Sequence, residues 1–206
     1  MVSDPMRSIK TGLLYLLAFG VAAYAVFAYG VLPLGSVVHP DMRGNFLAHP
    51  AGIYTHVFAS AVALVVGPLQ FSSALRQKHV RIHRWLGRVY LGVGVLVGGL
   101  SGLYLAQHAF GGTVARLGFA ALAVAWLYTG LRAYLAARQG AIHKHRKWMV
   151  RNFSLTFAAV TLRFYVPGSI AMGIDFAQAY AAIAWLCWVP NLAFVEWRYN
   201  RALRAL

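Results

Sequence analysis

The sequence is poor in acidic residues, with four Asp and Glu against 19 Lys and Arg and a formal net charge of +15. Proton-coupled transport normally uses carboxylates inside the membrane, and Glu196 is the only acid in or beside a long apolar run, so ion-coupled transport is disfavoured. In a soluble protein such a basic balance would suggest nucleic acid. Here the cations lie between apolar runs, which argues against nucleic acid and favours topology signals that contact anionic lipid headgroups.

Cysteine and catalytic motifs are also scarce. Cys187 is the only cysteine, so an intrachain disulfide is excluded. Nothing resembles a phosphate-binding glycine loop, a Ser/His/Asp set or a metalloprotease helix. The histidines His39, His49 and His108 would need to join His56 to form a metal site, but their spacing is irregular and no carboxylate or thiolate accompanies them, which disfavours metal binding.

Long apolar runs are what the sequence has in abundance, because 60% of its residues are hydrophobic and only 11% are charged. This composition indicates one polytopic membrane domain over residues 1–206. A lipid-exposed backbone must satisfy its own hydrogen bonds, so the fold is expected to be all-α. Six runs are long enough to cross a hydrocarbon core of about 30 Å. They are 11–33, 51–71, 85–107, 117–137, 149–172 and 177–196.

The basic residues alternate between the two sides of these runs. Most Lys and Arg precede the first run, follow the last, or lie between the second and third and between the fourth and fifth. The loops on the other side hold only Arg43 and Arg116. By the positive-inside rule, both termini are expected to be cytoplasmic. The opposite loop at 33–50, rich in Pro, Gly and Asn, is expected to form turns.

Two basic stretches repeat each other at an offset of 62 residues, since Arg76 corresponds to Arg138 and His83 to His145. We call residues 76–85 the first hinge and residues 138–148 the second hinge. The offset predicts that the second and third runs form one helical hairpin and the fourth and fifth a parallel copy of it. The two hairpins would form a central four-helix bundle.

The paired hinge histidines suggest a cofactor. His83 and His145 would lie at one depth on facing helices, as the axial ligands of haem b do, with Arg84 and Arg146 placed to pair with its propionates. The alternative is that each His-Arg-Trp is only the start of a helix at the membrane interface, with charges that direct topology. The sequence leaves both interpretations open.

A second candidate site lies in the opposite half of the membrane, where His56 and Arg163 are expected. An unpaired arginine at that depth costs at least ~2.5 kcal/mol on insertion scales, so it should face a wet cavity or the bundle interior. We therefore expect a polar cavity that opens to this side of the membrane and binds a small anion or a quinone-like carbonyl, with Tyr54, Tyr104 or Gln107 completing its wall. The alternative is an arginine that snorkels or caps a helix.

Three functions follow from these two sites. The first is a b-type cytochrome that transfers electrons between a quinone or similar small carrier and an acceptor. The second is a haem-free membrane protein that binds or moves a small anionic or carbonyl-bearing molecule at His56 and Arg163. The third is an accessory membrane subunit without a site of its own.

Several local stretches carry a resemblance. They are His56, the segment 67–71, the segment 83–90, the segment 145–152 and the segment 161–163. In these, the chain resembles a family of predicted bacterial inner-membrane proteins classed as a domain of unknown function, which implies a location in the bacterial inner membrane. The layout is also similar to that of the four-helix di-haem cytochromes related to cytochrome b561. Those carry a second histidine pair, and here Gly118 stands where a partner for His56 would be, so the similarity implies at most one haem.

Overall fold

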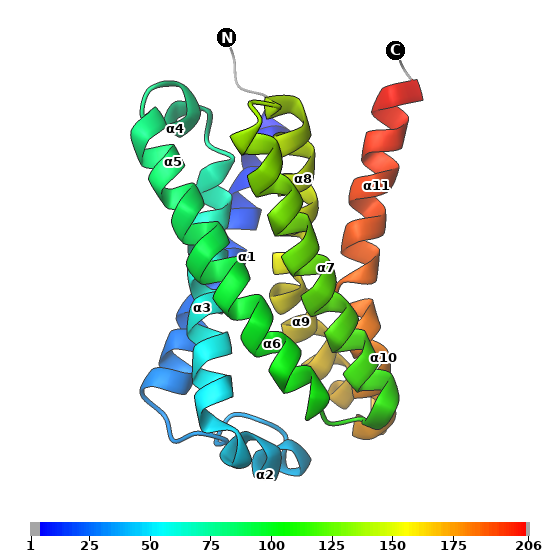
Figure 1. Ribbon diagram of the computed structural model, residues 1–206. Helices are drawn as coiled ribbons and strands as arrows, with labels where there is room; N and C mark the ends of the chain where they lie inside the picture. Colours follow the sequence, from blue (N-terminus) through cyan, green and yellow to red (C-terminus); the bar gives the residue numbers. More distant parts are fainter. Residues whose placement is uncertain (1–4, 205–206) are drawn as a thin grey trace.

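The computed structural model describes residues 5–204, and each regular element in that range is helical, which confirms the all-α prediction. Helix α1 (Pro5–Gly30) begins, and helix α11 (Val189–Arg204) ends, at the same end of the bundle, here called the basic end. Helix α2 (Pro40–Ala48) lies at the opposite, far end (Figure 1). The helices in chain order are α1 (Pro5–Gly30), α2 (Pro40–Ala48), α3 (Pro50–Gln70), α4 (Ser73–Gln77), α5 (Val80–Val89), the π-helix η1 (Tyr90–Val97), α6 (Gly98–Gln107), α7 (Gly112–Arg138), α8 (Ile142–Thr156), α9 (Ala158–Ala171), α10 (Phe176–Leu186) and α11 (Val189–Arg204).

Six helical stretches are long and apolar enough to cross a membrane, as predicted. They are Gly12–Gly30, Pro50–Gln70, Val80–Gln107, Gly112–Arg138, Ile142–Ala171 and Phe176–Tyr199. The predicted starts at 85 and 149 are too late, because α5 and α8 begin inside the hinges. Hydropathy ends a run at its basic residues, but Arg81, Arg84 and Arg88 are exposed along one face of α5, where a helix readily continues.

The two central hairpins run in the same direction. Helices α3 and α7 rise from the far end to the basic end, and α5–η1–α6 and α8–α9 return (Figure 1). Both returning helices also depart from regular α geometry at equivalent places. The π-helix covers residues 90–97, and the break between α8 and α9 falls at Phe157, which the 62-residue offset relates to Val95. Such irregular turns often occur at functional sites.

A contact between Tyr90 and Asn152 lies at the centre of the bundle. The two residues are 62 positions apart, so each is the repeat equivalent of the other. The Tyr90 hydroxyl donates to Asn152 Oδ1 at 2.8 Å, and both side chains are completely buried. Equivalent residues of a parallel pair meet on the axis that relates the two copies, so the hairpins pack around a pseudo-two-fold axis at this contact, as the repeat predicts.

Close helix packing around this axis depends on small residues. A Cβ added to Gly67 would lie 2.5 Å from the ring of Phe153, and one added to Gly94 would lie 2.8 Å from the Cβ of Ala63. Without a hydrophobic driving force between helices in lipid, such close approach supplies much of the packing energy.

Helix α2 corrects the prediction that residues 33–50 form only turns. Pro40 stands at the first helical position, where its missing N–H is not needed, and Nδ1 of His39 accepts the backbone N–H of Asp41 at 3.4 Å. Individual turn-forming residues therefore begin a short helix. It lies across the far end of the bundle (Figure 1).

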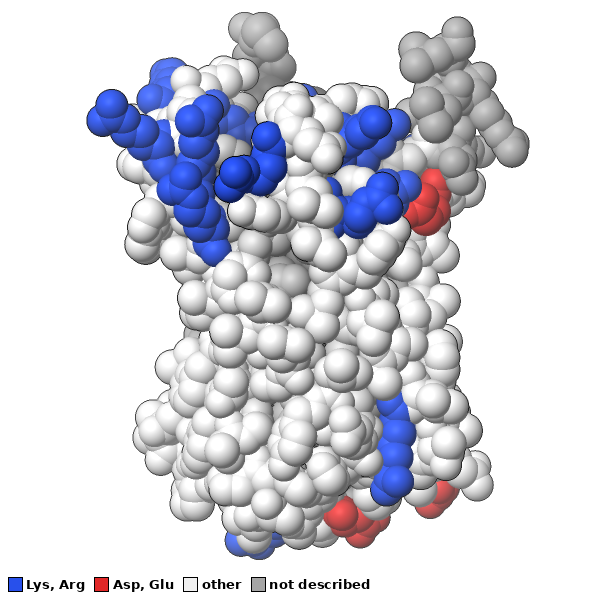
Figure 2. Space-filling model, viewed as in Figure 1, with Lys and Arg blue, Asp and Glu red and all other residues white. Residues whose placement is uncertain are grey.

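Lys and Arg side chains gather at the basic end (Figure 2). The acids in the described part of the chain are each engaged elsewhere: Asp41 with His39, Asp175 as the N-cap of α10, and Glu196 with Arg151. The last pair joins α11 to α8, since Nη2 of Arg151 donates to Glu196 Oε2 at 2.8 Å. The hinges therefore keep an uncompensated positive charge.

Candidate functional site

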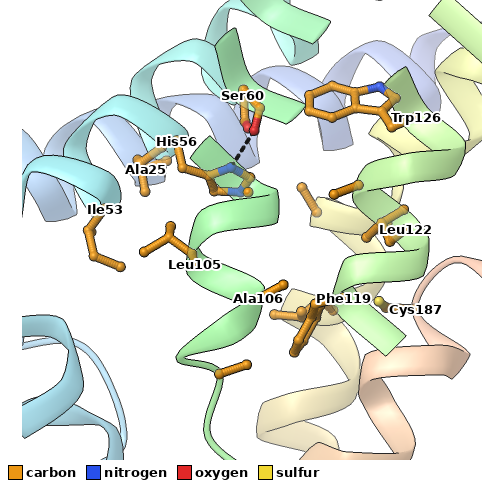
Figure 3. A pocket seen from close by; sticks show the side chains of 18 of the residues that line it. Ala25, Ile53, His56, Ser60, Leu105, Ala106, Phe119, Leu122, Trp126 and Cys187 are labelled. Atoms are coloured by element: carbon orange, nitrogen blue, oxygen red, sulfur yellow. Dashed lines mark hydrogen bonds between the residues drawn. The ribbon is translucent and has the colours of Figure 1, made fainter. Parts of the chain in front are cut away.

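A cavity of about 260 Å³ lies between the helices in the half of the bundle toward the far end. All six spans contribute to its wall, and α2 covers it with Met42, Asn45 and Phe46. The rest of the lining is mainly apolar, with Phe119 and Leu122 of α7 on one side (Figure 3). A mostly apolar cavity with a few polar groups is the usual form of a small-molecule site.

His56 lies on α3, and its ring points toward α6 (Figure 3). Nδ1 lies 2.9 Å from the carbonyl oxygen of Gly98. Because a carbonyl only accepts hydrogen bonds, Nδ1 carries the proton and Nε2 has no hydrogen-bond partner among the described residues. The ring packs closely on Gly102, where an added Cβ would lie 3.0 Å from it. His56 is therefore fixed by one nitrogen and free to bind with the other.

Arg163 lies on α9 and lines the same cavity. Its Nη1 donates to the carbonyl of Ala159, one turn earlier, at 2.9 Å, and its guanidinium carbon stands 5.8 Å from the centre of the Tyr24 ring. None of the acids in the described range 5–204 forms an ion pair with it. A guanidinium has five N–H donors, so most of them are not used by the protein.

Tyr54, Tyr104 and Gln107 do not line this cavity, contrary to the sequence prediction. Each stands next in the chain to a residue that does, namely Ile53, Leu105 or Ala106, and is rotated by about 100° from it around the helix. Tyr54 stacks on Phe58, and Gln107 is exposed.

Tyr104 instead belongs to a cluster at the far end. Its hydroxyl lies 2.8 Å from Nδ1 of His49, and the His49 ring stacks on His108 with centroids 3.9 Å apart. His39 stacks on Phe176. Within residues 5–204, no group of three or more His, Cys, Asp and Glu side chains is arranged to hold a metal ion.

A buried polar network forms the inner boundary of the cavity. Trp126 and Thr156 both line the cavity, and the indole N–H of Trp126 donates to Thr156 Oγ1 at 2.9 Å. Thr156 Oγ1 also lies 2.8 Å from the Tyr90 hydroxyl. The amide nitrogen of Asn152 donates to the Trp126 carbonyl at 2.8 Å and to Thr129 Oγ1 at 2.9 Å. These groups satisfy one another and hold three helices at the cavity wall.

The two hinge histidines lie at the same, basic end of the bundle. Nδ1 of His145 lies 2.9 Å from the carbonyl of Ala133, which leaves its Nε2 free. Nδ1 of His83 is buried without a partner. Arg84 and Arg146, the expected propionate partners, are exposed beside them.

A family model described as "Predicted membrane protein (DUF2306)" matches residues 53–198, more than half of the chain. The chain belongs to the DUF2306 family. The match spans the central hairpins and the last span, and so covers His56, Arg163 and both hinge histidines. No curated protein and no solved structure matches the chain.

Sequence reasoning missed several polar groups at the DUF2306 cavity. Tyr29, Ser60 and Tyr180 line it, and the Ser60 hydroxyl is buried with no partner. Ser60 is four residues after His56, so helical spacing alone would have placed it on the same face. Tyr29 and Tyr180 come from the first and last spans. The sequence does not determine which face of these two helices packs against the other four.

Proposed function

We propose that this DUF2306 protein binds a small, mostly apolar molecule in the far-half cavity, through one anionic or carbonyl group on that molecule. The observation that carries the proposal is Arg163, a cation without an acidic partner on the wall of a mostly apolar cavity. A fixed charge in low dielectric attracts an anion or the negative end of a carbonyl strongly. The unpartnered hydroxyl of Ser60 adds a further hydrogen-bonding group.

His56 gives the proposed site an acid–base group. With Nδ1–H held by Gly98, the Nε2 atom accepts a hydrogen bond from a ligand hydroxyl when the ring is neutral and donates one to a ligand carbonyl when it is protonated. A quinone-like ring fits this cavity. Its carbonyl would face His56 and Arg163, and its apolar body would lie against Phe119 and Leu122. A short-chain carboxylate satisfies it as well.

Tryptophan fluorescence tests the binding, because Trp126 is part of the cavity wall. Protein purified in detergent is titrated with menadione, a quinone that quenches indole fluorescence. In a second series it is titrated with octanoate, and binding is followed by the thermal unfolding midpoint of the protein. Saturable binding of at least one probe is expected, and replacing Trp126 with Phe should reduce the quenching by menadione. If neither probe saturates, the accessory-subunit interpretation is preferred.

The haem interpretation is the second candidate, favoured by the placement of His83 and His145 at the same end of the bundle. His145 has one nitrogen free for iron, and Arg84 and Arg146 stand beside the pair. A bound haem b would supply one-electron transfer, here between a quinone-like carrier and an acceptor. Neither histidine lines the far-half cavity, however, which holds an arginine without an acidic partner and a hydroxyl without a hydrogen bond. The far-half cavity is therefore the better supported site.

An absorption spectrum decides the haem question. A bound haem gives a Soret band and sharp reduced α and β bands, which His83→Ala and His145→Ala should each abolish. His143→Ala, an exposed neighbour, is the control and should keep them. A colourless preparation from haem-replete cells removes the cytochrome interpretation.

We also propose that the basic end faces the cytoplasm of a bacterial inner membrane, because positively charged loops are retained on that side. Reporter fusions after Arg76, Arg138 and Arg204 should all read cytoplasmic, and a fusion after Arg43 should read periplasmic. The opposite reading at any of these positions contradicts the orientation.

A further inference from the structure

An unsatisfied polar side chain lies beneath the hinges at the basic end. Gln70, at the end of α3, is only 6% exposed, and its Nε2 has no hydrogen-bond partner. Its Oε1 lies against Gly87 of α5. Its backbone is fixed as well, because Nη1 of Arg76 donates to the carbonyls of Gln70 at 3.3 Å and of Phe71 at 2.6 Å. A buried amide N–H₂ without an acceptor costs about 1–3 kcal/mol, so it calls for a ligand.

The second unsatisfied atom belongs to the same place. His83 lies one helical turn before Gly87, so both residues share the face of α5 that packs on Gln70. Nδ1 of His83 is buried without a partner. Two potential donors, one from α3 and one from α5, thus lack a partner where these two helices pack together.

The surroundings of these two atoms are positive. Arg76 lies beside Gln70, to whose carbonyl it donates, and Arg146 stands near the start of α8 at the same end of the bundle. Helices α5 and α8 both begin here, and neither has a side chain that caps its first N–H groups. A helix N-terminus carries a partial positive charge and open donors, which favour anions. The only described acid at this end, Glu196, is held by Arg151.

We propose that Gln70, His83 and Arg146, together with the helix starts of α5 and α8, form a binding site for a phosphate group. α3, α5 and α8 each bring open donors or positive charge to this end, and a phosphate has enough acceptor oxygens and charge to use several donors at once. A phospholipid headgroup and free phosphate share this chemistry. The site is at the opposite end of the bundle from the cavity and does not depend on the function proposed for it.

Thermal unfolding of the full chain in detergent tests the site with defined probes. One series adds sodium phosphate against sodium chloride at equal ionic strength. A second adds dioleoylphosphatidylglycerol against dioleoylglycerol, which has the same chains and no phosphate. A saturable rise of the unfolding midpoint is expected with at least one phosphate-bearing probe. A rise with free phosphate identifies the soluble ion as sufficient, and a rise with the lipid alone identifies the headgroup.

Three variants separate a built site from general charge. Gln70→Leu and Arg146→Gln should each raise the half-maximal probe concentration at least tenfold. Arg138→Gln removes the same charge from the same end, but the Arg138 guanidinium lies against Tyr134 of its own helix, so its response should match the wild type within twofold. Arg146 is exposed, so its variant serves if Gln70→Leu fails to fold. No saturable effect with either probe, or an equal effect in all variants, overturns the proposal.

Discussion

Replacing Arg163 with leucine is expected to weaken binding in the cavity by about 10- to 100-fold. A hydrogen bond to a charged group contributes about 1.5–3 kcal/mol, and each 1.4 kcal/mol is a factor of ten in affinity. Arg163 is the cavity's only cationic lining residue, and its positive charge has no acidic partner in the described chain. Titration of the variant with menadione and octanoate measures the loss.

Arg163→Lys keeps the charge and separates charge from geometry. Lysine cannot make the planar two-point contact of a guanidinium, so a loss of about tenfold is expected. The control is Arg116→Leu, which removes an exposed arginine outside the cavity and should not change binding. Unchanged affinity in Arg163→Leu would mean that Arg163 serves only the helix, through its bond to Ala159.

Replacing Asn152 with leucine is expected to cost about 2 kcal/mol of stability. The substitution removes three hydrogen bonds, to Tyr90, Trp126 and Thr129. Hydrogen bonds between membrane helices average about 0.6 kcal/mol each, and the partners left without Asn152 add to the loss. Unfolding by dodecyl sulfate in mixed micelles gives the free-energy difference.

Ser154→Ala is the matched control for this prediction. Ser154 is buried on the same helix, but its hydroxyl donates only to the carbonyl of Arg151 three residues earlier. Its loss should cost well under 1 kcal/mol, because the bond is local and joins no second helix. Equal costs for the two variants would show that the Asn152 network does not hold the hairpins together.

The architecture followed from the sequence because hydropathy and charge report directly on it. Apolar runs gave the spans, and the 62-residue offset of the hinges gave the parallel hairpins. The same offset relates Tyr90 to Asn152, which form the central contact. The sequence did not indicate this contact, because Tyr and Asn are chemically different residues at equivalent positions. Helix starts were the weak point, since amphipathic α5 continues through residues that end a hydropathic run.

The candidate site was only partly predictable. Depth along the spans brought His56 and Arg163 to one level, and the structure gives them a common cavity. Direction around each helix was not considered, and for that reason Tyr54 was expected at the cavity and Ser60 was not. The cover formed by α2 depends on tertiary contacts, such as the stacking of Phe46 on Tyr29, that local turn signals do not report.

Mass spectrometry of the small molecules that copurify with the protein shows whether Arg163 holds a ligand in the cavity. Wild type and Arg163→Leu are purified in parallel, extracted, and compared. The account predicts that the wild type carries a small molecule with a carboxylate or a quinone-like carbonyl, and that the variant carries at least tenfold less of it. Equal amounts of the same molecules in both preparations would contradict a site built around Arg163.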